Sequence, residues 1–273
     1  MASSDAQASR IQPSRLKALF ATLFLLCWIV VGVVAMTICR LFKLDATYKF
    51  PLLFHGVVCR LFGMQCEYSG ERRTERPTLF VANHASYMDV FVLGAVIPGA
   101  FVAKSEVSGW PLFGKLAKLQ NTLFFERKAQ RAASQISQLH DHLMNESDLI
   151  LFPEGTSTSG SWVAPFRSSL FAATEGFYVQ PVSVAYVDYE GQPMSERDRD
   201  FYAWYLPDPK QVPPQPNRPF AAHFWEGLGL GRSRVCVHFH EPVLVEKGGR
   251  KAAAKVCEEK VRDGLYSLLG KSA

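Results

Sequence analysis

The chain has 273 residues, of which 48% are hydrophobic and 20% are charged, and its formal net charge is +5 at pH 7. This composition excludes a disordered chain and fits one globular domain of about 200–230 residues with an added apolar segment. The mild positive charge suits an anionic membrane surface or an anionic substrate. No nucleic-acid partner is expected, because no Lys/Arg run is interleaved with aromatic residues. The six cysteines form no C-x-x-C pair, which predicts reduced, buried thiols and neither disulfides nor a zinc site.

The first predicted element is an uncharged apolar helix at residues 18–39. At 1.5 Å per residue it extends about 33 Å, which is enough to cross the hydrocarbon core of a bilayer. A signal peptide is the alternative, but its apolar core is usually about 7–15 residues long and ends in a small-residue cleavage site. This segment is longer and runs directly into Arg40. We therefore predict an uncleaved membrane anchor, preceded at residues 1–17 by a cytoplasmic or disordered tail.

A second apolar stretch at residues 50–64 is too short to span a membrane and contains His55 and Arg60. We expect a helix on the membrane surface, with Arg60 directed toward the headgroups. The alternative is a helix that covers the core of the domain. The predicted anchor comprises residues 18–66, and the globular domain comprises residues 70–273, beginning with a polar linker.

Beyond this linker, short apolar strands alternate with helices, which predicts an α/β fold with a mostly parallel or mixed sheet and flanking helices. The predicted strands are residues 78–82, 100–103, 122–125, 149–152, 179–187 and 234–239. The predicted helices are residues 86–96, 111–119, 128–144, 167–174 and 250–269. The proline-rich stretch at residues 207–219 is expected to be an irregular loop.

The segment Asn83-His84-Ala85-Ser86-Tyr87-Met88-Asp89 carries the clearest chemical signal. His84 follows an apolar strand, and sites in α/β domains lie at strand ends. A turn before the next helix would bring Asp89 back to the imidazole, where it would fix the tautomer and stabilise the imidazolium. The alternative is a surface histidine and a helix-capping aspartate. Since no G-x-S-x-G serine is present, we expect His84 to activate a substrate hydroxyl directly. No metal-binding motif is present either.

Three other features are candidates for ligand binding. One apolar strand leads to Arg127, whose guanidinium has the geometry to bind phosphate or carboxylate. Another leads to Glu154 and Gly155, a sharp turn whose glycine exposes backbone N–H groups. Arg167 would begin a helix and supply a cation beside free N–H groups. A surface ion pair and an ordinary turn are the alternatives for the first two. Pro181 lies within an apolar strand and predicts an edge strand or a bulge that shapes a pocket wall.

Together, these segments resemble the glycerolipid acyltransferase family, typified by 1-acylglycerol-3-phosphate acyltransferases. The family pattern N-H-x-S-x-x-D, F-I-D/E-R, F-P-E-G-T and V-x-P-V appears here in the same order over residues 78–190. The four blocks are Asn83-His84-Ala85-Ser86-Tyr87-Met88-Asp89, Phe124-Phe125-Glu126-Arg127, Phe152-Pro153-Glu154-Gly155-Thr156 and Val179-Gln180-Pro181-Val182.

The resemblance implies that His84 is the general base and Asp89 its partner. Arg127, Glu154 and Gly155 would position the acceptor, and Pro181 would shape the acyl pocket. We add three further residues as candidate substrate-binding groups: Thr156, Lys104 and Arg167.

Two departures bear on the acceptor. Asn121 stands where the second family block often has glycine, and Ser157 stands where the third block often has arginine. The missing arginine weakens the case for a phosphate headgroup, although Arg167 would compensate for it. The Thr-Ser-Thr-Ser-Gly run followed by Pro-Phe-Arg-Ser also resembles the subgroup that acylates lyso-ornithine lipid.

The resemblance implies a membrane-bound O-acyltransferase that acts on a lysolipid. The favoured reaction converts 1-acyl-sn-glycerol-3-phosphate to phosphatidic acid, and lyso-ornithine lipid or another lysophospholipid is the alternative acceptor. The donor would be acyl-CoA or acyl-carrier protein, with no other cofactor. Because thioester donors are made in the cytoplasm, the domain is expected at the cytoplasmic face of the inner membrane. A non-catalytic lipid-binding protein and a membrane-associated hydrolase are the competing hypotheses.

Overall fold

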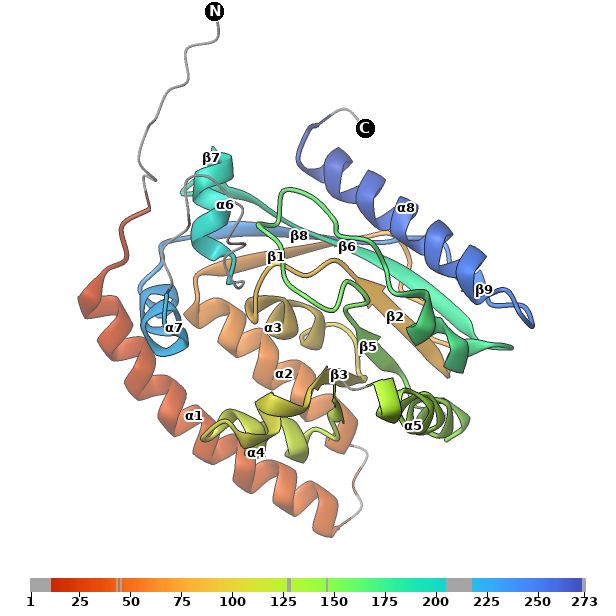
Figure 1. The fold of residues 1–273 in the computed structure, drawn as a ribbon. Helices are drawn as coiled ribbons and strands as arrows, with labels where there is room; N and C mark the ends of the chain where they lie inside the picture. The colour runs from red at the N-terminus through yellow and green to blue at the C-terminus, as the bar shows by residue number, and fades with distance from the viewer. Residues whose placement is uncertain are drawn as a thin grey trace, which may run out of the picture.

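Strand β2 (Thr78–Ala82) is buried at every position because helices cover both faces of the sheet around it (Figure 1). This computed structural model describes residues 11–42, 44, 46–126, 129–145, 147–204 and 218–271. Its sheet has the strand order β1-β8-β6-β2-β5-β3-β4, and the short strands β7 and β9 pair with β6. The other strands are β1 (Met64–Ser69), β3 (Ala100–Lys104), β4 (Leu123–Phe125), β5 (Leu149–Leu151), β6 (Tyr178–Tyr189), β7 (Gln192–Pro193), β8 (Ser233–Phe239) and β9 (Val243–Leu244).

The run from β6 through β2, β5 and β3 to β4 is parallel, whereas β8 is antiparallel to β6 and parallel to β1. The predicted mixed, mostly parallel α/β fold is therefore confirmed. One face of the sheet packs against α2 and α3, and the other packs against α5, η3 and α8. The α-helices are α1 (Arg15–Leu41), α2 (Ala46–Leu61), α3 (Met88–Gly94), α4 (Phe113–Leu119), α5 (Ala132–Met144), α6 (Glu196–Tyr202), α7 (Phe220–Leu228) and α8 (Arg250–Leu268). The 3-10 helices are η1 (Ser105–Gly109), η2 (Ala129–Arg131) and η3 (Ser168–Thr174).

Helix α1 lies along the domain and buries one stripe against α2 and α7 (Figure 1). Its buried residues recur every three or four positions, which is the spacing of one helix face; they are Ala18, Ala21, Leu25, Ile29, Gly32, Met36 and Cys39. The outer face is apolar and exposed, as at Phe20, Leu23 and Val30. Within the described part of the chain, α1 is the one helix long and apolar enough to cross a membrane.

Helix α2 begins and ends earlier than the predicted residues 50–64 and covers the core of the domain. It packs against α3, and its Phe54 and Val58 are buried. This is the alternative given for the segment, although Leu53 and Arg60 remain exposed. Residues 64–66 of the predicted anchor and residues 67–69, which were assigned to neither the anchor nor the domain, form β1 and pair with β8. Strand β1 and the helices α6 and α7 were not predicted from the sequence, and residues 207–217 of the predicted loop lie outside the described residues.

Pro181 lies in an interior strand, so of the two predicted settings, an edge strand or a bulge, the edge strand is wrong. Strand β6 runs between β2 and β8, and Pro181 is in register with Val81. The carbonyl of Pro181 accepts a hydrogen bond from the His240 backbone N–H at 3.0 Å. The proline nitrogen faces the same side, where β8 has ended at Phe239 and β9 has not begun. A break in the neighbouring strands therefore accommodates the missing N–H donor.

Candidate active site

Asn83 fixes the point at which the chain leaves β2. Its side-chain amide donates to the Val184 carbonyl at 2.9 Å, and its side-chain oxygen accepts the Val184 N–H at 2.8 Å. These two bonds extend the β2–β6 pairing by one residue through a side chain. His84 is thereby presented at the carboxyl end of the parallel strands, the position that α/β folds use for their sites.

Asp89 faces His84, as predicted, because the turn at Ala85 and Ser86 folds the start of α3 back toward the strand. Asp89 Oδ2 lies 2.9 Å from His84 Nδ1 and also accepts the backbone N–H groups of Ala85 and Ser86, at 2.7 and 2.9 Å. The carboxylate is 1% exposed. A carboxylate buried to this degree needs several hydrogen-bond donors, and these bonds supply them.

The imidazole of His84 is held against the wall of the site while its outer nitrogen remains available. The ring stacks on Phe152 with centroids 4.0 Å apart, and the side chain is 23% exposed. Since Asp89 holds Nδ1 as a donor, Nε2 is the nitrogen that accepts a proton. In the part of the chain that the structure describes, Nε2 has no hydrogen-bond partner. This arrangement suits a general base that acts on an incoming hydroxyl.

Tyr186 completes the support of Asp89, and it was not among the site residues predicted from the sequence. Its hydroxyl donates to Asp89 Oδ1 at 2.7 Å, and the whole side chain is buried. Burial and the neighbouring Asp89 raise the pKa of this phenol well above its usual value, so it stays a donor. The available signal was its alternation with Val182 and Val184 on β6, which places a polar tyrosine on an apolar strand face.

Glu154, which was predicted to position the acceptor, holds the chain around His84. Its two carboxylate oxygens accept the backbone N–H groups of His84 and Ala164, each at 2.7 Å. The residue is 3% exposed, and each of its oxygens faces one of these backbone donors. Burial is the main reason that the pKa of Glu154 rises to about 8. Glu154 is therefore a positioning residue that fixes the backbone of the base.

Gly155 and Arg167 lie in contact beside this turn. Gly155 adopts φ +67°, and a Cβ placed on it would lie 2.8 Å from Arg167 Cζ. The Arg167 side chain is exposed, and Arg167 is the N-cap of the 3-10 helix η3, where a helix was predicted to begin. Thr156 is exposed on the same turn. The predicted cation thus lies at the edge of the site, next to the backbone of the Pro-Glu-Gly turn.

The structure does not bring all the candidates together. Lys104 is exposed at the carboxyl end of β3, in register with Phe125 on β4. It therefore shares with His84 the edge of the sheet at which the parallel strands end. Arg127 lies outside the described residues, so its role stays a prediction.

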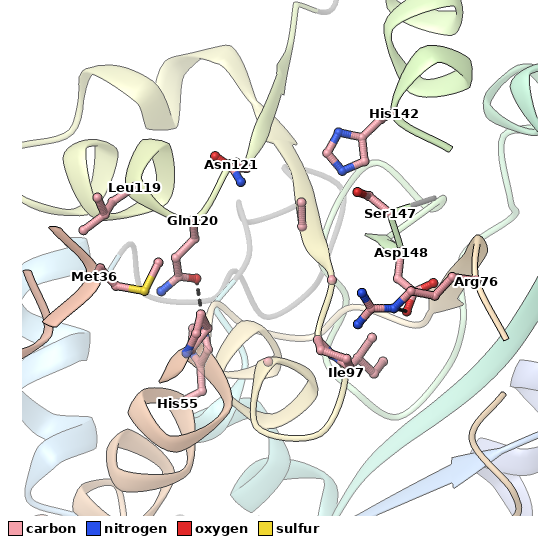
Figure 2. A pocket seen from close by; sticks show the side chains of 15 residues that line it. Met36, His55, Arg76, Ile97, Leu119, Gln120, Asn121, His142, Ser147 and Asp148 are labelled. Carbon is pink, nitrogen blue, oxygen red and sulfur yellow. Dashed lines mark hydrogen bonds and ion pairs between the residues drawn. The ribbon is translucent and has the colours of Figure 1, made fainter. Parts of the chain in front are cut away.

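A cavity of about 100 Å³ lies at the opposite edge of the sheet (Figure 2). It is lined by Ala100, where β3 begins, and by Asp148, which precedes β5. On one side His55 bonds to Gln120 at 2.9 Å, and burial lowers the pKa of His55 to about 4. The cavity therefore holds a neutral histidine far from the strand ends that carry His84, and it is not the reaction centre.

Comparisons with known proteins agree with the geometry. A family model described as Acyltransferase matches residues 65–186. A lyso-ornithine lipid O-acyltransferase from Brucella abortus (strain 2308) is 37% identical over 81% of this chain and 83% of the relative. A 1-acyl-sn-glycerol-3-phosphate acyltransferase from Neisseria gonorrhoeae is 34% identical over 45% of this chain and 50% of the relative.

The fold has a match among solved structures. The crystal structure of the 1-acyl-sn-glycerophosphate (LPA) acyltransferase PlsC from Thermotoga maritima has a TM-score of 0.63 and 22% identity, over 94% of this chain and 97% of that one. The family expected from the four sequence blocks is confirmed, and a non-catalytic role is set aside. With more than two thirds of the Brucella relative matched at this level of identity, the chain belongs to the acyltransferase family that contains the lyso-ornithine lipid and 1-acylglycerol-3-phosphate acyltransferases.

Proposed function

We propose that this acyltransferase transfers a fatty acyl group from an acyl thioester to the hydroxyl of lyso-ornithine lipid. The extent of similarity carries this choice. The Brucella relative, named for that acceptor, matches 81% of the chain, whereas the gonococcal relative, named for 1-acyl-sn-glycerol-3-phosphate, matches 45%. Ser157, in place of the arginine common in the resembling family, agrees with a headgroup other than phosphate. The acceptor favoured from sequence, 1-acyl-sn-glycerol-3-phosphate, becomes the second candidate.

The dyad supports direct transfer without an acyl-enzyme. His84 Nε2 takes the proton of the acceptor hydroxyl as its oxygen attacks the thioester carbonyl carbon. Asp89, bonded to Nδ1 at 2.9 Å, stabilises the resulting imidazolium. The C–S bond then breaks, and the imidazolium returns its proton to the departing thiolate. An ester and a free thiol result, and the dyad is regenerated.

The donor and the location follow from the chemistry. We propose acyl-CoA or acyl-carrier protein as the donor, since both carry a fatty acyl thioester, and no other cofactor. Attachment to a membrane is supported by the apolar outer face of α1 and by the family. We place the domain at the cytoplasmic face of the inner membrane, where thioester donors are made. Protease protection of the C-terminal region in inside-out vesicles would contradict this orientation.

The test is thiol release from acyl-CoA by the detergent-solubilised full chain, with each acceptor in turn. Wild type is compared with His84→Ala and with a matched control, His140→Ala, because His140 is a half-exposed histidine on α5. We expect release that depends on lyso-ornithine lipid, is lost in His84→Ala and is retained in His140→Ala.

Other outcomes change the assignment. A preference for 1-acyl-sn-glycerol-3-phosphate supports the second candidate. Release without any acceptor indicates a thioesterase. If no thiol is released with either acceptor, the assay is repeated with an acyl-carrier protein thioester as the donor. If no thiol is released from that donor either, the proposed reaction is overturned.

A further inference from the structure

Two opposite charges, Arg167 and Glu258, flank the loop that follows the Pro-Glu-Gly turn. Arg167 precedes η3, and Glu258 lies on α8, so the charges come from elements far apart in the chain. The backbone N–H of Phe166 donates to Glu258 Oε2 at 2.8 Å. The carboxylate is therefore attached to the residue directly before Arg167.

Arg167 is held in place by its backbone while its guanidinium remains available. Its backbone N–H donates to the Pro153 carbonyl at 3.0 Å, and its side chain packs on Gly155. Among the residues that the structure describes, the guanidinium has no hydrogen bond or ion pair. An exposed arginine fixed beside the turn that holds His84, without an internal anion, is suited to an anionic group of a ligand.

Glu258 has capacity for a cationic ligand. Its side chain is 25% exposed, and its ion pair with Arg262, in which Nη1 lies 3.8 Å from Oε1, is longer than a hydrogen bond. The negative charge of Glu258 also acts on the site. Burial is the main cause of the raised pKa of Glu154, and repulsion by Glu258 raises it further. Glu154 in turn bonds the backbone of His84. Both charges thus adjoin the loop that positions the base.

We propose that Arg167 and Glu258 select a zwitterionic headgroup, with Arg167 binding a carboxylate of the acceptor and Glu258 binding its ammonium group. This inference rests on the proposed function, because an ornithine headgroup is an amino acid that carries both charges. A phosphate headgroup offers only negative charge, so Glu258 repels it. Ser157 adds to this selection, because the cation common at its position in the resembling family is absent.

The experiment measures kcat/KM for lyso-ornithine lipid and for 1-acyl-sn-glycerol-3-phosphate in Glu258→Gln and Arg167→Gln. Glutamine at 258 keeps an oxygen that accepts the Phe166 N–H while removing the charge. The matched control is Glu259→Gln, the next residue on α8, whose carboxylate faces Lys255 at 3.9 Å.

We expect Glu258→Gln to lower kcat/KM for lyso-ornithine lipid about tenfold, through KM, and to spare or improve the use of 1-acyl-sn-glycerol-3-phosphate. Arg167→Gln should lower kcat/KM for both acceptors, because both carry an anion, and Glu259→Gln should match wild type. An unchanged acceptor ratio in Glu258→Gln overturns the pairing. If the wild-type enzyme acylates 1-acyl-sn-glycerol-3-phosphate but not lyso-ornithine lipid, the proposed function itself is overturned.

A change in the ligand tests the same contact without relying on the stability of a variant. Lyso-ornithine lipid with its free amino group acetylated lacks the ammonium that Glu258 would bind. With the wild-type enzyme, kcat/KM for the acetylated lipid should be lower than for the natural lipid. The factor should be about the same as that by which Glu258→Gln lowers kcat/KM for the natural lipid. Wild type that uses both forms equally well contradicts the contact.

Discussion

Replacing Asp89 with asparagine separates the charge of this residue from its hydrogen bonds. Three donors meet Oδ2, from the His84 ring and from the backbone of Ala85 and Ser86, while Tyr186 donates to Oδ1. An asparagine oxygen in the place of Oδ2 accepts the same three bonds. Its amide group then faces the Tyr186 hydroxyl, which rotates to accept. The Asp89→Asn variant should therefore keep the fold and the tautomer of the base and lose only the negative charge.

The loss in rate follows from the charge that develops on His84. Opposite unit charges about 4 Å apart attract by about 4 kcal/mol at an effective dielectric constant of about 20. Since about 1.36 kcal/mol corresponds to a factor of ten in rate, kcat should fall about 10³-fold. This lies within the range of about 10²–10⁴ typical of general-base catalysis. Asp89 is 1% exposed and does not reach the acceptor, so the acceptor KM should change little.

The assay is thiol release at a saturating concentration of acceptor. His84→Ala gives the background rate without the base, and Asp89→Ala serves as the comparison for stability. Alanine at 89 leaves two backbone N–H groups and the Tyr186 hydroxyl without a partner, at about 1–3 kcal/mol each. Asp89→Ala should therefore melt well below wild type, and Asp89→Asn close to it. A kcat for Asp89→Asn above one tenth of wild type would refute the charge argument. Equal melting of the two variants would refute the hydrogen-bond argument.

Three further predictions concern the support around the dyad. Tyr186→Phe removes one donor to Asp89 and should lower the free energy of unfolding in urea by about 1–3 kcal/mol; an unchanged midpoint contradicts the contact. Glu154, with its pKa raised to about 8, binds a proton in the folded state that the unfolded state releases near its ordinary value of 4.5. Stability should therefore fall as pH rises from about 4.5 to 8, and unfolding curves at several pH values should show this slope in wild type but not in Glu154→Gln. Gly155→Ala forces alanine to φ +67° at a cost of about 1–2 kcal/mol and displaces the Arg167 guanidinium. Its acceptor KM should rise while its donor KM stays constant, and a rise in the donor KM alone would contradict this placement.

The local sequence determined the strands that carry the site and the dyad itself. Residues 79–82 and 149–152 are continuous apolar runs, followed by Asn83 and by the Pro153-Glu154-Gly155 turn. Each strand and its end can therefore be recognised from the local sequence alone. His84 and Asp89 are five residues apart, and a single turn closes the distance between them. The glycine turn at Gly155 was visible for the same reason, because the backbone conformation it needs is a property of one residue.

Tertiary structure alone decided which side chains support the dyad. Tyr186 reaches Asp89 across 97 positions, and Glu154 reaches the His84 backbone across 70. Neither contact has a periodicity or a spacing that a sequence displays, because strand order and register set both. Pro181 is a similar case. The sequence shows that a proline lies within a strand, but only the assembled sheet shows that β8 ends and β9 has not begun beside it. Local propensity thus specified the reacting pair, and the long-range pairing of β2, β5 and β6 specified the hydrogen bonds that hold it.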